Sequence, residues 1–319
     1  MGTFAPTSQI ASSRGGVAAI NADFSVDPGR PMHSIGLGGD LTQIGRAGTM
    51  FGFSSDLRHH VITQGRPSAS FVNLKSKARR VIANFNSGDP SGGDVVAYTR
   101  YGASGGIKPP GSACSARLGR PSKLHWASPK HVGLYRNWVV RAVACQSSPM
   151  AVQVGTIVLS ARTSGFGSKA IRALRAGGGV RVSWSLGHQG VEETVAGMPE
   201  LVTNGVDTAP PVSCRTYFCR QNARTAIGVT ASGKILLVVV DGNQRTWSNG
   251  LTLWALGKEM ISLGARYAVN LDGSGGSTMW VKGQGVINRP SDWSGVRPVT
   301  SALLVMRGTS QLARCPSQG

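Results

Sequence analysis

The stretch ILLVVVDG, residues 235–242, decides more of the fold than any other part of the chain. Six consecutive apolar residues, mostly β-branched, predict a strand that is buried on both faces and ends at Asp241. The apolar residues that follow have helical spacing, which predicts a helix over residues 253–263 with Thr252 as its N-cap and Gly264 at its C-terminal end. A helix of this length can join two parallel strands.

A second strand is predicted at residues 267–271, and it leads into NLDGSGGSTM at residues 270–279. Because the carboxyl ends of parallel strands meet at one edge of a sheet, we expect Asp241 and Asp272 at the same edge. Glycines such as Gly275 permit a tight turn whose N–H groups can bind an anion. Two carboxyl groups beside such a turn are the minimum set for acid–base or nucleophilic chemistry on a glycosidic bond. The structural alternative is a glycine-rich hairpin with a turn aspartate.

The strand–helix–strand unit predicts an α/β (mixed α+β) fold, in which helices flank a mixed β-sheet and loops are frequent. The 319 residues, of which 40% are hydrophobic and 44 are glycine, fit a loop-rich globular protein. We expect a single large domain over residues 1–307 and a disordered tail over residues 308–319. Residues 105–130 are rich in glycine, proline and serine and are expected to form a surface excursion. No apolar run approaches the roughly 20 residues of a membrane-spanning helix.

Six segments together resemble the phosphodiester glycosidase family. In chain order they are AAINADF (18–24), GTIVLSA (155–161), GMPELVTNG (197–205), RTAIGVTASGKILLVVVDG (224–242), GLTLWALGKEMISLGARYAVNLDGSGGSTM (250–279) and VINRPSDWSGVRPVTSALLV (286–305). The sequence departs from the family pattern in three places: Ser274 and Gly276 are exchanged in the glycine run, Ser25 replaces a phenylalanine, and Ala223 replaces a proline.

The resemblance implies a hydrolase that cleaves a glycosyl-1-phosphodiester to a free sugar and a phosphate monoester, on an extracellular or cell-envelope glycan. The candidate catalytic carboxyl groups are those of Asp272 and Asp241, with Asp23 third. Arg224 and Arg297 are the expected phosphate partners, because a guanidinium binds phosphate through two hydrogen bonds. The other substrate-binding candidates are Asn21, Thr225, Asn270, Gly273, Ser274, Gly275, Ser277 and Asn288.

For these residues the structural alternatives are turn or cap aspartates and surface ion pairs. No cofactor is expected, although a bound divalent cation stays open as an alternative. The six histidines have no metal-site spacing and are expected in surface or structural roles. Trp280 and Trp293 are candidates for stacking against a sugar.

The net charge of +20 indicates attraction to a polyanion or, equally, a solvated basic surface. The expected partner is a phosphate-bearing glycan or a sugar phosphodiester. A nucleic-acid-binding protein is a less favoured alternative, because the chain has no zinc-finger, helix-turn-helix or RNA-recognition motif. A phosphoglycan-binding module without catalysis is the other alternative.

The five cysteines form no CxxC pair. Proximity favours a Cys214–Cys219 disulfide, which leaves Cys114 to pair with Cys145 and Cys315 alone; five free thiols in a reducing compartment are the alternative. The family acts outside the cytosol, which favours oxidation and a secreted or cell-envelope location. The first twenty residues contain no export signal, and we expect either that the sequence is truncated at its N-terminus or that its export signal is missing.

Overall fold

A computed structural model describes residues 4–26, 29–46, 48–54, 60–63, 67–86, 90, 93–103, 107–120, 134–187 and 191–307. The protein is mostly β, with 44% strand and 13% helix. The expected α/β (mixed α+β) fold with helices flanking a sheet is therefore wrong. The predicted strand–helix–strand unit exists, but most strands pair antiparallel with their neighbours in the sheets, and antiparallel pairs need no crossover helix. The predicted tail, residues 308–319, lies outside the described residues.

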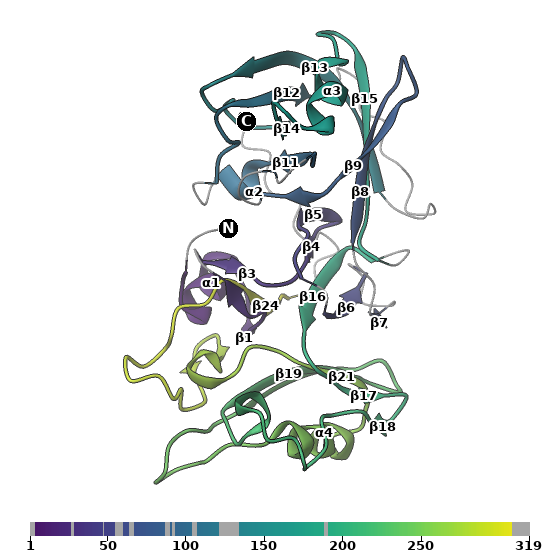
Figure 1. The fold of residues 1–319 in the computed structure, drawn as a ribbon. Coiled ribbons are helices and arrows are strands. Elements are labelled where there is room, and N and C mark those ends of the chain that lie inside the picture. Colours follow the sequence, from purple (N-terminus) through teal and green to yellow (C-terminus); the bar gives the residue numbers. More distant parts are fainter. Residues whose placement is uncertain are drawn as a thin grey trace. The chain divides into compact units, whose positions relative to one another are not determined.

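The contacts divide the chain into two compact units (Figure 1). The first consists of Met1–Gly2, Ser34–Gly45 and Arg66–Glu193, and the second consists of Thr3–His33, Arg46–Gly65 and Thr194–Gly319. Segments far apart in the sequence therefore build each unit.

An eight-stranded sheet forms the first unit, in the order β10-β11-β14-β12-β13-β15-β8-β9. Its strands are β8 (Ser68–Asn73), β9 (Arg79–Ile82), β10 (Asn84–Phe85), β11 (Val96–Tyr98), β12 (Ala113–Gly119), β13 (Leu134–Gln146), β14 (Thr156–Arg162) and β15 (Gly179–Ser185). The unit also contains β4 (Ile35–Leu37), β5 (Asp40–Gln43), α2 (Arg100–Ala103) and α3 (Phe166–Arg172). Residues 105–130 are expected to form a surface excursion, and this prediction is wrong for β12. This strand pairs with a neighbour on both edges, and six of its seven residues are buried. Its small side chains suit this central place in the sheet.

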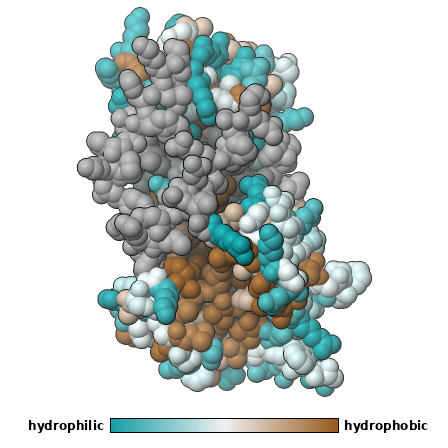
Figure 2. Space-filling view, turned by 180° about the vertical axis from the view of Figure 1, so that it is seen from behind, coloured by the Kyte–Doolittle hydropathy of each residue, from teal (hydrophilic) through white to brown (hydrophobic). Residues whose placement is uncertain are grey.

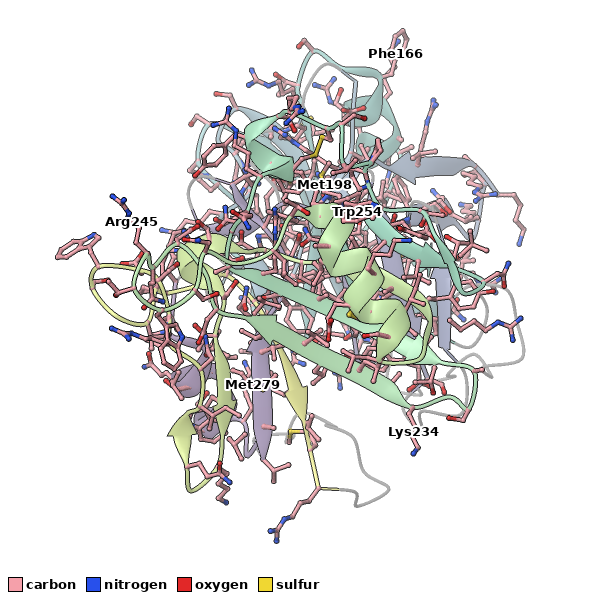
Figure 3. The ribbon with its side chains drawn as sticks, turned by 90° about the horizontal axis from the view of Figure 1, so that it is seen from below. Phe166, Met198, Lys234, Arg245, Trp254 and Met279 are labelled. Atoms are coloured by element: carbon pink, nitrogen blue, oxygen red, sulfur yellow. A yellow bond between two sulfur atoms is a disulfide. The ribbon has the colours of Figure 1, made fainter. Side chains whose placement is uncertain are left out.

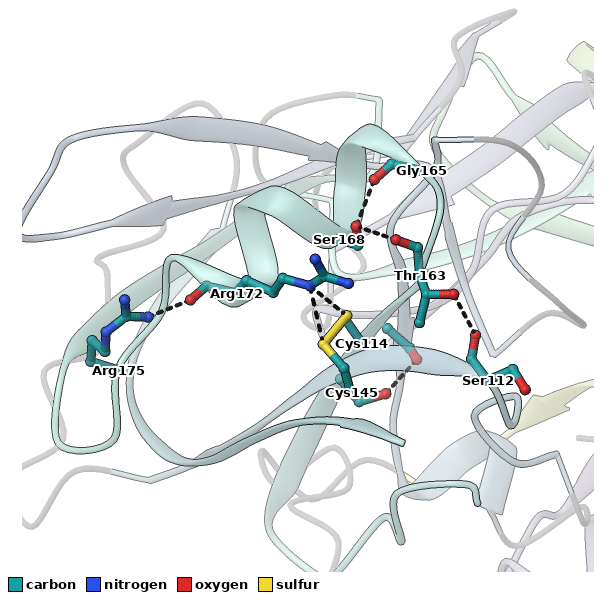
Figure 4. The surroundings of a disulfide bond; sticks show 10 residues. Ser112, Cys114, Cys145, Thr163, Gly165, Ser168, Arg172 and Arg175 are labelled. Carbon is teal, nitrogen blue, oxygen red and sulfur yellow. Dashed lines mark hydrogen bonds between the residues drawn. A yellow bond between two sulfur atoms is a disulfide. The ribbon is translucent and has the colours of Figure 1, made fainter. Parts of the chain in front are cut away.

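A disulfide joins two neighbouring strands of this sheet. Cys114 on β12 and Cys145 on β13 are register partners with Cα atoms 3.9 Å apart. Arg172 of α3 donates its Nε–H toward both sulfurs, at 3.2 and 3.3 Å (Figure 4). The bond confirms the predicted pairing, and it removes conformational freedom from the unfolded chain.

The second unit contains the predicted strand–helix–strand unit. Its five-stranded sheet has the order β18-β17-β21-β19-β20, with β17 (Glu200–Thr203), β18 (Val206–Asp207), β19 (Arg224–Thr230), β20 (Ile235–Val240) and β21 (Ala265–Asn270). β20 and β21 are both antiparallel to β19, so they run parallel to each other on its two sides. Helix α4 (Leu253–Ser262) joins them, and the Thr252 hydroxyl caps it by accepting a hydrogen bond from the N–H of Ala255.

The two faces of this sheet pack in different ways. On one face, α4 buries Leu253, Leu256 and Met260 against the sheet (Figure 3). On the other face, Val269 and Leu271 pack in a second apolar cluster that includes Ile20 of β1 (Ala18–Asn21). As an edge strand, β20 is half-buried along its whole length, and the prediction that it is buried on both faces is wrong. Figure 2 shows a broad apolar area on one face of the molecule.

The second unit also contains a four-stranded sheet in the order β23-β22-β1-β24. The remaining elements of the second unit are α1 (Thr7–Ser13), β2 (Ser25–Val26), β3 (Arg30–Pro31), β6 (Thr49–Phe53), β7 (His60–Thr63), β16 (Glu193–Gly197), β22 (Met279–Val281), β23 (Gly285–Val286), β24 (Ala302–Val305) and the 3-10 turns η1 (Tyr217–Cys219) and η2 (Ser274–Gly276). In the described part of the chain, no helix has the length and apolarity needed to cross a membrane.

Candidate active site

A cavity of about 350 Å³ in the second unit brings together Asp23, Asp272 and Arg297. Asp23 comes just after β1, Asp272 comes just after β21, and Arg297 precedes β24. The rest of the lining is largely apolar and consists of Phe4, Phe24, Ser25, Met32, Pro298, Val299 and Thr300. The cavity therefore combines two carboxyl groups and one cation with surface that can contact a sugar ring.

Asn21 holds the ends of the two carboxylate-bearing strands together. Its Nδ2 donates to the carbonyl oxygen of Asp272 at 2.6 Å, while the Asp272 N–H donates to the carbonyl oxygen of Ala22 at 2.9 Å. The Oδ1 of Asn21 accepts from the Thr225 hydroxyl at 2.7 Å and from the Thr278 N–H at 3.1 Å. Because Asn21 is fully buried, its substitution would leave several polar groups without partners.

Asp272 forms an ion pair with Arg297, the one arginine among the described residues that line the cavity. Its Oδ2 lies 3.1 Å from Nη2 of Arg297, with the two side chains 19% and 38% exposed. Burial raises the pKa of Asp272 to about 6, although the nearby Arg297 lowers it, and the charge of Asp23 raises it further. The carboxyl group therefore changes its charge around pH 6.

The glycine turn packs directly under this ion pair. A Cβ atom on Gly276 would lie 2.8 Å from Nη2 of Arg297 and 3.0 Å from Oδ2 of Asp272, so a larger residue would push the pair apart. A Cβ atom on Gly273 would lie 2.7 Å from a backbone carbonyl oxygen. The N–H groups of Gly276 and Ser277 donate to carbonyl oxygens within the turn, and that of Ser274 donates to the carbonyl oxygen of Ala223. These three N–H groups are therefore used by the backbone, and Arg297 supplies the positive charge.

Asp23 is held by His33, a residue for which the sequence predicts only a surface or structural role. The His33 N–H donates to Oδ2 of Asp23 at 2.7 Å, and its Nδ1 lies 2.6 Å from Oδ1. Both side chains are buried, and burial raises the pKa of Asp23 while the hydrogen bonds and charge of His33 lower it. The turn sequence at residues 27–29, Asp-Pro-Gly, is the one signal that the chain folds back here.

Asp241 follows β20, and it does not line the cavity. Its Oδ1 accepts from the side chain of Asn288 at 3.0 Å and from the N–H of Arg289 at 2.9 Å, while its Oδ2 accepts from Nε1 of Trp247 at 2.9 Å. Asn288 also donates to the carbonyl oxygen of Ser277 at 3.0 Å. Asp241 thus ties two loops to the end of the glycine turn.

Arg224 also lies outside the cavity lining. It is buried, and it donates to the carbonyl oxygens of Leu251 at 2.9 Å, Phe218 at 2.9 Å and Arg220 at 2.5 Å. Burial lowers the pKa of Arg224 to about 10. The guanidinium holds the segment that contains η1, which the Cys214–Cys219 disulfide closes, as predicted.

The remaining predicted residues lie around the turn. Thr225 and Ser277 are buried, and their hydroxyls are 3.2 Å apart. Asn270 is buried and donates to the carbonyl oxygen of Met198 at 2.7 Å. Ser274 has a positive φ of 58°, and its hydroxyl accepts from Asn243 at 3.2 Å. A Cβ atom on Gly275 would lie 2.8 Å from Oδ2 of Asp292.

Known proteins resemble the chain in sequence and in fold. It is 31% identical over 104 residues to N-acetylglucosamine-1-phosphodiester alpha-N-acetylglucosaminidase from Bos taurus. The matched region covers 31% of this chain and 19% of the bovine protein. The Homo sapiens protein of the same name is also 31% identical over 104 residues, and the matched region covers 20% of the human protein. Each match spans about a fifth of the relative's length.

Two crystal structures share the fold. A Burkholderia pseudomallei protein superposes with a TM-score of 0.66 at 19% identity, over 95% of this chain and 68% of the other. A Synechocystis protein gives 0.65 at 17% identity, over 94% and 53%. The sequence pattern of the phosphodiester glycosidase family matches residues 135–306, more than half of the chain. The chain therefore belongs to the phosphodiester glycosidase family.

Proposed function

We propose that the protein hydrolyses a glycosyl-1-phosphodiester to a free sugar and a phosphate monoester. The observation that carries this proposal is that Asp272, Asp23 and Arg297 line one and the same cavity in a member of this family. The names of the bovine and human relatives specify the same class of bond.

The proposed chemistry follows from the leaving group. In a sugar phosphodiester the departing phosphate monoester is already a stabilised anion, so strong protonation by a general acid is not needed. The reaction instead needs a carboxylate that attacks the anomeric carbon or activates water, together with a cation for the phosphate. We assign the first role to Asp272 and the second to Arg297.

The environment of Asp272 supports this assignment. Its pKa of about 6 makes it ionised at pH 7 and keeps it basic enough to accept a proton. Arg297 presents several N–H donors, so it can bind a phosphate oxygen and retain its contact with Asp272. Asp23, fixed by His33, is the second carboxyl group facing the substrate.

The apolar lining supports a sugar as the other half of the substrate. Phe24 lies against His33 and Phe218, with ring centroids 6.1 and 5.9 Å apart, so its ring is fixed beside the carboxyl groups. Aromatic rings of this kind contact the C–H faces of sugars.

The two disulfides support a place outside the cytosol, because such bonds persist in oxidising compartments. We therefore propose that the substrate is part of an extracellular or cell-envelope glycan.

The test is a turnover assay on methyl phosphodiesters of N-acetylglucosamine, glucose and mannose, with free sugar and methyl phosphate measured separately. We expect equal release of the two products from at least one substrate and no detectable release by Asp272→Asn. The matched control is Asp207→Asn, because Asp207 is also 19% exposed and pairs with a cation, Lys258, at 3.4 Å. Its activity should equal that of the wild type. No turnover by the wild-type protein on any of the three diesters would contradict the proposal.

A further inference from the structure

Two exposed tryptophans lie on the loops that flank the glycine turn. Trp247 is 61% exposed and Trp293 is 97% exposed. The loop of Trp247 is fixed to the turn by the hydrogen bond from Asn243 to Ser274, at 3.2 Å. The loop of Trp293 contacts the turn through its neighbour Asp292, which packs against Gly275. Large aromatic rings left in water beside a candidate active site indicate a binding surface.

Trp247 is held in place despite its exposure. Its indole N–H donates to Asp241 at 2.9 Å, and its backbone N–H donates to the carbonyl oxygen of Gln244 at 2.8 Å. The Gln244 side chain donates in turn to the carbonyl oxygen of Arg289 at 2.7 Å. The ring is therefore preorganised, so a ligand that stacks on it loses little free energy in ordering it.

Two arginines lie on the loops that carry and contact this ring. The guanidinium carbon of Arg289 lies 5.6 Å from the centroid of the Trp247 ring. Arg245, on the same loop as Trp247, is exposed and projects outward from the ribbon (Figure 3). Asp241, which accepts the indole N–H, also accepts hydrogen bonds from Asn288 and from the N–H of Arg289. A ligand for this surface should therefore combine rings for stacking with negative charge.

We propose that Trp247, Trp293, Arg245 and Arg289 form a subsite for a phosphate-bearing oligosaccharide, the part of the substrate that extends beyond the scissile phosphate. The inference rests on the proposed function, because Arg297 in the cavity is the expected ligand of that phosphate. Sugar rings would stack on the two indoles, and further phosphate groups would bind the two arginines. The substrate is then an anionic glycan rather than an isolated sugar phosphodiester.

Binding can be measured without turnover by calorimetric titration with pentamannosyl phosphate, a monoester that contains no diester to cleave. Neutral mannopentaose and a single-stranded oligonucleotide are the comparison ligands. We expect Trp247→Ala to weaken binding of the phosphorylated glycan about 5- to 30-fold, the loss that corresponds to one stacking and cation contact of about 1–2 kcal/mol. The control is Trp254→Ala, because Trp254 is also exposed and has a cation, Lys258, 5.8 Å from its ring centroid.

Equal affinities for Trp247→Ala and Trp254→Ala would overturn the inference, and so would equal binding of the neutral and phosphorylated glycans. Tighter binding of the oligonucleotide than of the glycan would overturn it in favour of a nucleic-acid surface. A protein that binds the phosphorylated glycan through Trp247 but cleaves no sugar phosphodiester would retain the subsite and refute only the proposed hydrolysis.

Discussion

The ends of β20 and β21 offer a direct comparison, because each strand is followed by an aspartate at the same edge of one sheet. Asp272, after β21, lines a cavity and has one charged partner, Arg297. Asp241, after β20, accepts three hydrogen bonds from loop groups and lines no part of that cavity. The same position in the sheet thus places one carboxyl group in a cavity beside an arginine and makes the other a structural anchor.

The two arginines predicted to bind phosphate differ in the same way. Arg224 is buried and donates to three backbone carbonyls, whereas Arg297 is partly exposed and faces Asp272. A side chain whose hydrogen bonds are already made to fixed partners has fewer left for a substrate. We therefore propose that Asp272 and Arg297, rather than Asp241 and Arg224, act on the substrate. This difference predicts separate effects of substitution on activity and on stability.

The largest expected effect separates the two aspartates. Asp272→Asn should lower kcat by roughly two orders of magnitude or more, because a nucleophile or base is removed. Asp241→Asn should cost about tenfold or less, since it only loosens two loops. Steady-state kinetics on the best diester, together with circular dichroism to verify folding, measures the difference. Equal losses of kcat in the two variants would contradict the different roles assigned to Asp272 and Asp241.

The arginines should divide stability from binding. Arg224→Lys should lower the free energy of unfolding by roughly 2–4 kcal/mol, because an ammonium group cannot reach three carbonyls in the geometry of the guanidinium. Arg297→Lys should leave the urea midpoint near that of the wild type and raise KM about tenfold. Urea unfolding and KM values for both variants test this. A raised KM with unchanged stability for Arg224→Lys would return that residue to the phosphate site.

The smallest expected effect is a shift in pH dependence. Asp272 must be ionised to act, so kcat/KM should rise with pH through about 6 and then level off. Arg297 lowers the pKa of Asp272, so Arg297→Gln should move this rise to higher pH by about one unit. An acidic limb that stays at the same pH in Arg297→Gln would show that another group titrates.

Local pattern predicted much of this architecture. The helix with its Thr252 cap, the parallel relation of β20 and β21, and the Cys214–Cys219 disulfide follow from residues close in sequence. The Cys114–Cys145 disulfide follows as the pair that remains. The overall class did not follow, because the many antiparallel pairs join short segments whose partners lie far along the chain, such as Ile20 beside Leu303.

The candidate site likewise contains residues that local sequence predicts and residues that depend on distant contacts. The turn at Asp272 carries a strong sequence signal, whereas the pairing of Asp23 with His33 depends on how the intervening chain folds back. Sequence also cannot tell an arginine that bonds to carbonyls from one that faces a cavity. Trp247 was missed for the same reason, because its exposure depends on the fold of its loop and on the anchor at Asp241.

The central claim is that a group in the cavity directs attack at the anomeric carbon of the sugar rather than at phosphorus. Hydrolysis of a sugar phosphodiester in water enriched in heavy oxygen distinguishes the two, because the label enters the fragment that is attacked. The mass of the phosphate monoester is the decisive readout. We predict that the monoester contains no label. Attack at the anomeric carbon breaks the bond between that carbon and the bridging oxygen, so the monoester keeps its original oxygen atoms. Incorporation of the heavy oxygen into the monoester would show cleavage at phosphorus and contradict the account.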